Sequence, residues 1–135
     1  PELEVYDTGH LDACLRLRDA GLLDDPLTFS IVLGVQGGAA ATAENLITMV
    51  NRLPDGAIWQ IIAIGRNNLA LTGMALAMGG NARAGMEDTL HLRKGELTPG
   101  NDPLVARAVA LARCLDRGIA TVEEAAHVLG IEGRH

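Results

Sequence analysis

The chain has 135 residues, is 48% hydrophobic and carries a formal net charge of −6, which predicts one soluble globular unit with enough apolar residues for a core. Its 11 basic residues are dispersed, which argues against nucleic-acid and anionic-membrane partners because both need clustered Lys and Arg. The sequence has no apolar run of about 18 residues and no signal-peptide pattern, so a cytoplasmic location is the default expectation.

The first 78 residues show three successive units of a strand followed by a helix. The strand and helix of each unit are predicted over residues 2–6 and 10–22, 28–35 and 42–53, and 58–64 and 68–78. The first helix is expected to end near Gly21, and Pro54 stops the second. The middle strand is almost continuously apolar, which is typical of a parallel sheet with both faces covered.

A fourth unit is predicted as a short strand over residues 81–85, a loop, and a long helix over residues 103–117. Asp102 is the expected N-cap of that helix, with Pro103 at its first helical position. A capping box over residues 121–124 opens a last short helix. Both cysteines, Cys14 and Cys114, fall in helical segments and are expected to be small, buried or half-buried hydrophobic side chains.

Four such units predict an α/β fold with a parallel sheet, because each helical crossover returns the chain to the same strand direction. An open doubly wound sheet and part of a (β/α)8 barrel both fit this pattern. A complete barrel takes about 250 residues, so four units are close to half of one. Half a barrel leaves two unpaired strand edges, which natural proteins avoid exposing. The chain is therefore expected to be a fragment of a barrel or to pair with another chain.

The segment from Gly79 to Asp88 places one cation, Arg83, near two adjacent carboxylates, Glu87 and Asp88. In an extended backbone, adjacent side chains point to opposite sides, so one carboxylate can hold a metal while the other faces a substrate. The alternative is an ion pair in a surface loop, and such pairs contribute little to stability.

Polar residues and glycines follow all four predicted strands, where ligands bind in barrels and open parallel sheets alike. They are Asp7, Thr8 and His10; Gln36, Gly37 and Gly38; Gly65, Arg66 and Asn67; and Arg83, Glu87 and Asp88. This is more than a purely structural sheet requires, and it indicates a binding site. His10 is the exception, since it is expected to be a residue of the first helical turn and not a ligand.

Several of these candidates have two readings. The backbone N–H groups of Gly37 and Gly38 can bind a phosphate or a thioester tail, but a plain tight turn fits equally well because the GxGxxG spacing is incomplete. Arg66 either binds an anion or pairs with a carboxylate at the rim. Glu2 and Glu4 share one strand face, and buried carboxylates there need a cationic substrate group or a neighbouring Arg as partner.

Four segments in order carry a family resemblance: PELEVYDTGHL, FSIVLGVQGG, LPDGAIWQIIAIGRNN and MGGNARAGMEDTLHLRKGEL. Over residues 1–131 the sequence resembles the β-keto acid cleavage enzymes. The resemblance implies that residues 1–135 are the C-terminal half, strands five to eight, of one TIM-barrel catalytic domain. The N-terminal half would be absent from this sequence and supplied by a preceding segment or another chain, and a homo-oligomer is expected.

The resemblance also implies a transferase reaction of amino acid catabolism, in which a β-keto acid and acetyl-CoA exchange groups to give acetoacetate and a new acyl-CoA. In the family a zinc ion assists, held by two His of an HxH motif and by the Glu of an RxGxED motif, which matches Glu87. The two His would belong to the absent half. Alone, the 135-residue chain is therefore expected to be inactive.

The Arg and Asp of the same family motif match Arg83 and Asp88, which would form a dyad that generates the enolate of the keto acid. A glutamate of the fifth strand, Glu4 or Glu2, would contact the distal group of the substrate. Asn81 stands where the family commonly has His, so a hydrogen bond there is expected to differ. The alternative function is a non-catalytic half-barrel module that binds a partner chain or an anionic ligand of the phosphate or CoA type.

Overall fold

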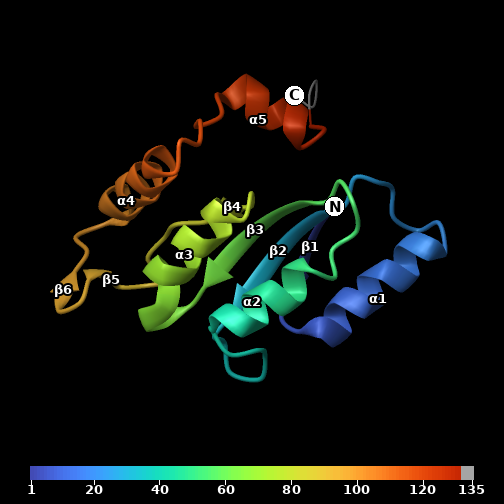
Figure 1. The fold of residues 1–135 in the computed structure, drawn as a ribbon, viewed down its shortest axis with the longest axis horizontal. Helices are drawn as coiled ribbons and strands as arrows, with labels where there is room; N and C mark the ends of the chain where they lie inside the picture. Colours follow the sequence, from blue (N-terminus) through green and yellow to red (C-terminus); the bar gives the residue numbers. More distant parts are fainter. Residues whose placement is uncertain (132–135) are drawn as a thin grey trace.

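The computed structural model describes residues 1–131 as an α/β fold built on one four-stranded parallel sheet. Its strands are β1 (Glu2–Val5), β2 (Thr28–Leu33), β3 (Ile58–Ala63) and β4 (Asn81–Ala82). Their order in the sheet is the same as their order along the chain, and every neighbouring pair is parallel (Figure 1). The predicted parallel sheet is therefore confirmed.

Five α-helices accompany the sheet within the described residues: α1 (Thr8–Asp19), α2 (Ala43–Val50), α3 (Asn68–Ala77), α4 (Asn101–Cys114) and α5 (Val122–Val128). A short 3-10 turn, η1 (Gly65–Asn67), precedes α3. Helices α1, α2 and α3 all cover the same face of the sheet (Figure 1). A doubly wound sheet needs a point where the strand order reverses, and the order of the described strands has none. The arrangement is consistent with part of a (β/α)8 barrel.

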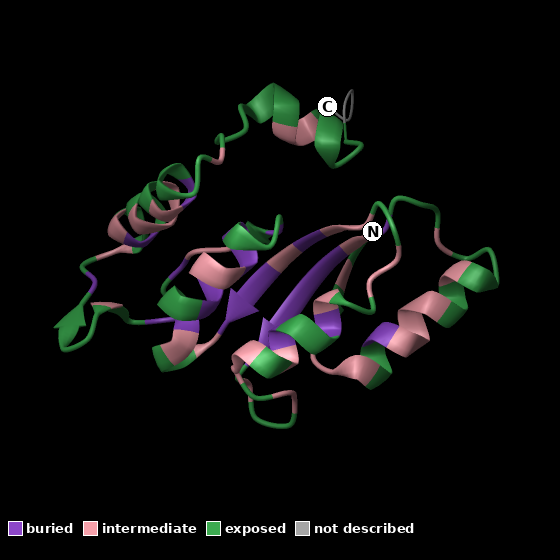
Figure 2. Cartoon of the chain, in the orientation of Figure 1, coloured by how far each residue is buried: buried purple, intermediate pink, exposed green. Residues whose placement is uncertain are grey.

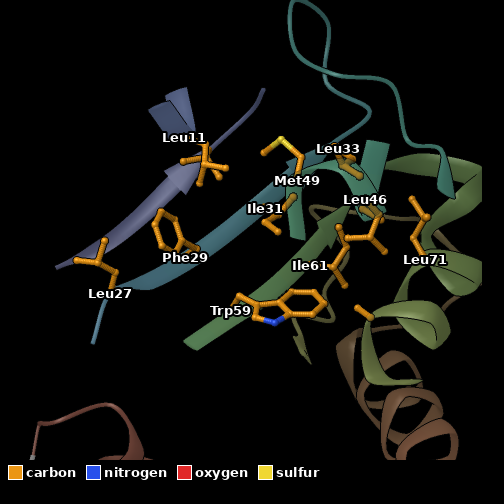
Figure 3. Packing of buried hydrophobic residues seen from close by; sticks show 13 residues of the cluster. Leu11, Leu27, Phe29, Ile31, Leu33, Leu46, Met49, Trp59, Ile61 and Leu71 are labelled. Atoms are coloured by element: carbon orange, nitrogen blue, oxygen red, sulfur yellow. The ribbon is translucent and has the colours of Figure 1, made fainter. Parts of the chain in front are cut away.

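The hydrophobic core lies between the sheet and these three helices. Strands β2 and β3 contribute side chains to this core from paired positions, since Phe29 lies opposite Trp59 and Ile31 lies opposite Ile61. From the helices, mainly leucines and other aliphatic side chains complete the cluster (Figure 3): Leu11, Leu46, Met49, Leu71 and Ala75. Strands β2 and β3 are the most continuously buried part of the chain (Figure 2). With few aromatic residues available, the core consists of aliphatic side chains around one Phe and one Trp.

The fourth unit differs most from its prediction. β4 has only two residues, and the following segment forms a hairpin of β5 (His91–Arg93) and β6 (Glu96–Leu97) that was not predicted. Its turn depends on Gly95, whose φ of +80° is readily adopted by glycine. The polar composition of this hairpin concealed it, because both its faces are largely exposed and show no alternation.

The start of α4 was also predicted wrongly. The N-cap is Gly100 and not Asp102, so Pro103 is the third helical residue. The turn before the helix is set by Thr98, whose hydroxyl donates to the carbonyl oxygen of Gly100 at 2.6 Å. Pro103 remains compatible with this because N–H groups of the first turn have no helical acceptor.

The capping box of α5 is confirmed, because Thr121 and Glu124 exchange side-chain and backbone hydrogen bonds of 2.8 and 3.2 Å. Cys14 packs half-buried against the core as expected, whereas Cys114 is exposed, so that prediction was wrong. Cys114 is the last residue of α4. Among residues 1–131, no helix combines the length and the apolar character needed to cross a bilayer.

Candidate functional site

The site forms where β4 ends beside β3. The backbone N–H of Arg83 donates to the carbonyl oxygen of Ile61 at 3.2 Å, so the chain stays alongside β3 beyond the last β4 residue. Asn81 strengthens this contact, since its side-chain amide donates to the carbonyl oxygen of Trp59 at 3.1 Å. Asn81 therefore fastens β4 to β3. The direction in which Arg83 leaves the sheet follows from these two contacts.

Arg83 and Asp88 form a two-point ion pair. The Nε of Arg83 donates to Oδ2 of Asp88 at 3.0 Å, and Nη2 donates to Oδ1. The Asp88 side chain is fully buried, whereas the Arg83 side chain is 39% exposed. The pKa of Arg83 is raised, first by the hydrogen bonds to Asp88 and further by the charges of Asp88, Glu87 and Glu4. An exposed loop ion pair, the alternative that the sequence left open, does not describe this buried carboxylate.

The backbone holds Asp88 equally firmly. Its carbonyl oxygen accepts from the N–H of Gly65 at 2.8 Å, and its own N–H donates to the carbonyl oxygen of Gly85 at 3.2 Å. A third bond, from the N–H of Met86 to Oδ1 of Asn101 at 2.8 Å, ties the same loop to the first residue of α4. The carboxylate of Asp88 is thus fixed by the loop after β3, by its own turn and by Arg83.

Glu87, the neighbouring carboxylate, lies in the opposite environment. Its side chain is 59% exposed, and its Oε1 is 3.9 Å from Nε of Arg83. The carboxylate folds over Gly85, where an added Cβ would be 2.2 Å from Oε2. Glu87 is therefore accessible as a metal ligand. Within residues 1–131 no three His, Cys, Asp or Glu side chains are grouped to hold a metal ion, so these residues do not provide a complete set of ligands.

The two glutamates of β1 have different surroundings. Glu2 accepts hydrogen bonds at Oε1 from the hydroxyl of Ser30 and, at 3.0 Å, from Nε2 of Gln60. Its partners are neutral, and neither a cationic group nor an Arg is needed. Glu4 instead accepts from the phenol of Tyr6, and this hydrogen bond is the main reason that the pKa of Tyr6 is raised.

The charge of Glu4 on β1 also acts on Arg83, which follows β4 at the opposite edge of the sheet. The negative charge of Glu4 contributes to the raised pKa of Arg83. The positive charge of Arg83 in turn offsets part of the rise in the pKa of Tyr6. Two strands, β2 and β3, separate β1 from β4 in the sheet. Of the two glutamates that the sequence offered, Glu4 is the one whose charge reaches the Arg83 site.

The glycine-rich loop after β2 is used mainly by the chain itself. The N–H of Gly38 donates to the carbonyl oxygen of Val35 at 3.2 Å, so it is engaged in a turn and is not available to an anion in this conformation. A Cβ on Gly38 would approach the carbonyl oxygen of Tyr6 to 3.1 Å, which favours glycine there. Gly37 has a φ of +92° and open space around it. For Gly38, the tight-turn reading is the better one.

Arg66 lies exposed in η1, on the wall of a groove of about 1040 Å³. Of the carboxylates that the structure describes, none forms an ion pair with it, so the predicted alternative of a rim pair is not observed. Glu87 and Asp88 line the same groove. Arg66 therefore shares one open space with the carboxylates that follow β4.

Three further cations line this groove and were missed as site residues: Arg93, Lys94 and Arg107. The only signal for the first two was the adjacent basic pair in HLRKGEL. Arg107 is structural: its guanidinium donates to the carbonyl oxygen of His91 at 3.3 Å, to that of Leu92, and to Oδ1 of Asn68 at 2.7 Å. It joins the hairpin to α3, and desolvation by burial lowers its pKa.

Comparison with known proteins identifies the family. The family model described as beta-keto acid cleavage enzyme matches residues 1–131. The 3-keto-5-aminohexanoate cleavage enzymes of Fusobacterium nucleatum and Acetoanaerobium sticklandii are 39% and 37% identical over 132 and 131 residues, which are 98% and 97% of this chain and 48% of each enzyme.

The 3-dehydrocarnitine:acetyl-CoA trimethylamine transferase of Rhizobium meliloti is 35% identical over 134 residues, 99% of this chain and 44% of that protein. The chain thus spans about half the length of the curated relatives it matches. Because the family match covers nearly every residue, the chain belongs to the beta-keto acid cleavage enzyme family.

Proposed function

We propose that this chain supplies strands five to eight of a (β/α)8 barrel that condenses a β-keto acid with acetyl-CoA and releases acetoacetate and a new acyl-CoA. The remaining half would come from a further segment of the same protein or from another chain, and we call the complete unit the assembled enzyme. The one-sided sheet supports this proposal, because barrel helices all lie outside. The observation that carries it is the buried Asp88 held by Arg83 beside an exposed Glu87.

In this proposal Asp88 is the general base. Its carboxylate removes a proton from the carbon between the two carbonyl groups of the keto acid, and the electron pair moves onto the keto oxygen to form an enolate. Arg83 keeps Asp88 ionised and aimed, since an opposite charge at hydrogen-bonding distance favours the charged carboxylate. The partial exposure of Arg83 also leaves its guanidinium within reach of a substrate anion.

The later steps need no further proton donor. The enolate carbon attacks the thioester carbonyl of acetyl-CoA, a C–C bond forms, the C–S bond breaks, and the CoA thiolate leaves. The thiolate then attacks the original keto carbon, and cleavage of the adjacent C–C bond gives the new acyl-CoA and the acetoacetate carbanion. Asp88 returns its proton to this carbanion, which restores the carboxylate for the next cycle.

Zinc would be held by Glu87 together with ligands from the other half of the barrel. When bound, it would act as a Lewis acid that lowers the cost of forming negative charge on the keto oxygen. The exposure of Glu87 and its loose 3.9 Å contact with Arg83 leave its carboxylate available for this role. Glu4 would face the distal group of the keto acid. Arg66, on the wall of the groove, and Gly37, which has open space around it, would face the thioester.

Substitution of the two adjacent carboxylates tests the proposal. In the assembled enzyme, Asp88→Asn should lower the rate of acetoacetate formation by roughly 10²- to 10⁴-fold, the usual contribution of a general base, and retain bound zinc. Glu87→Gln should lose zinc. Glu44→Gln is the matched control, since Glu44 is an exposed carboxylate in the first turn of α2 that does not line the groove, and it should keep both activity and metal. Wild-type rates in Asp88→Asn, with the fold verified by circular dichroism, would refute the assignment.

A further inference from the structure

The turn over residues 85–88, which carries Glu87, is held unevenly. At one end, the backbone of Asp88 is hydrogen-bonded to Gly85 at 3.2 Å and to Gly65 at 2.8 Å. Met86 and Glu87, in the middle of the turn, are both exposed. Among the described residues, no hydrogen bond reaches the backbone of Glu87. The direction in which the Glu87 side chain leaves the chain therefore depends on what fixes its neighbours.

The other end of the turn is held by a side chain from a distant part of the sequence. The backbone N–H of Met86, directly before Glu87, donates to Oδ1 of Asn101 at 2.8 Å across 15 positions of the chain. A backbone N–H can only donate, so the bond needs the side-chain oxygen of Asn101. Within residues 1–131 no other hydrogen bond holds Met86.

Asn101 is itself firmly placed. It is the first residue of α4, and the turn before it is set by Thr98, which is only 7% exposed and donates its hydroxyl to the carbonyl oxygen of Gly100 at 2.6 Å. Leu104, three residues further along the helix, is 1% exposed and anchors the start of α4 by burial. The oxygen that accepts from Met86 therefore projects from a fixed part of the fold.

We propose that Asn101 is a positioning residue, which holds Glu87 ready to bind the metal ion by fixing the backbone of Met86. The inference rests on the proposed function for the role of Glu87 as a ligand. Ordering the backbone of one residue costs roughly the equivalent of a tenfold loss of affinity. A hydrogen bond that orders the turn before the metal arrives removes this cost from binding. Asn101 itself touches neither the metal nor the substrate in this role.

The test is the affinity of the assembled enzyme for zinc, measured by competition with a chromophoric chelator. Asn101→Ala should raise the Kd for zinc roughly tenfold, the lower end of the usual cost of losing a group that orients a metal ligand. Asn101→Asp keeps an acceptor oxygen at the same place and should keep the wild-type Kd. Alanine is a good helix former, so α4 should persist. Asp102→Ala is the matched control, because Asp102 is the next, exposed residue of α4 and does not bond the turn.

A second measurement follows the hydrogen bond itself. Hydrogen exchange of the Met86 amide in the metal-free protein should be roughly tenfold faster in Asn101→Ala than in the wild type, because this exposed N–H then loses its acceptor. Asn101→Asp and Asp102→Ala should exchange at the wild-type rate. Faster exchange in Asn101→Ala with an unchanged Kd for zinc would overturn the inference, since the bond would then serve only the loop. Equal loss of zinc affinity in Asn101→Ala and Asn101→Asp would also overturn it.

Neither measurement needs turnover, so the inference and the proposed reaction can fail separately. A tenfold loss of zinc affinity in Asn101→Ala, in a protein that forms no acetoacetate, would support the inference and reject the reaction. Acetoacetate formation by a wild type whose zinc affinity equals that of Asn101→Ala would reject the inference alone. A wild type that binds no zinc would reject both.

Discussion

On the helix-covered face of the sheet, Phe29, Ile31 and Ile61 are fully buried, whereas the same strands carry Ser30 and Gln60 on the opposite face. The first face is closed by three helices of this chain and contains the hydrophobic core. The second face bears the polar network with Glu2, and Glu4 lies on it. The difference indicates that stability depends chiefly on one face, while the candidate chemistry depends on the other and on the loops beyond it.

The largest expected effect is on the helix-covered face. Leu46→Ala removes a fully buried side chain of α2 and should lower the free energy of unfolding by about 2–5 kcal/mol, because it leaves a cavity in the core. Urea unfolding followed by circular dichroism measures this. Ile47→Ala, at the next and 41% exposed position of the same helix, is the control. Similar losses for both variants would contradict the assignment of the core to this face.

The next effect concerns the junction of the core with β4. Gly80→Ala should cost about 1–3 kcal/mol of unfolding free energy, because its Cβ would lie 2.4 Å from the ring of Trp59, which is only 9% exposed. Gly73→Ala in α3 is the matched control, since nothing lies within 4 Å of its Cβ. That variant should gain about 0.5–1 kcal/mol from the higher helix propensity of alanine. Thermal melts of both variants would show opposite shifts.

A smaller change in stability is expected at the candidate site. Gly85→Ala should alter the free energy of unfolding by less than about 1 kcal/mol, because the atom it meets, Oε2 of Glu87, ends a flexible side chain. The displaced carboxylate should nevertheless reduce the zinc content of the assembled enzyme, measured by atomic absorption. Gly118→Ala, with nothing within 4 Å of the added Cβ, is the control. Full zinc content in Gly85→Ala would argue against Glu87 as a ligand in this conformation.

The smallest effect depends on pH. Asp7 caps α1 by accepting from the N–H of His10 at 2.9 Å, and this bond chiefly lowers the pKa of Asp7 from its ordinary value of 3.8. A lowered pKa in the folded state means that the stabilisation is fully present above pH 3.8 and is lost as the pH falls through the folded pKa. Asp7→Asn keeps an acceptor that does not titrate. Below pH 3.8 the melting temperature of Asp7→Asn should therefore rise relative to that of the wild type. A difference between the two melting temperatures that does not change with pH would show that titration of Asp7 does not affect stability.

The sequence alone determined the three leading βα units, the direction of the strands and the capping box at Thr121, because hydrophobic periodicity and capping are local. It also indicated different environments for the adjacent Glu87 and Asp88, which the structure shows as an exposed and a buried carboxylate. The backbone there is a turn over residues 86–88 and not the extended segment that the sequence argument assumed. The position of Asp88 depends on its contacts with Gly65 and Arg83.

Only the tertiary structure decided which candidates have partners. Glu2 and Glu4 are equivalent in the sequence pattern, yet Glu2 is bonded to Ser30 and Gln60 while the charge of Glu4 reaches Arg83. The β5–β6 hairpin, with Lys94 in its turn, was invisible because its short strands bury no alternating face. For the two glutamates the deciding contacts join residues far apart in the chain. Periodicity reports which face a residue occupies, and only the packed sheet and its loops determine what that residue meets there.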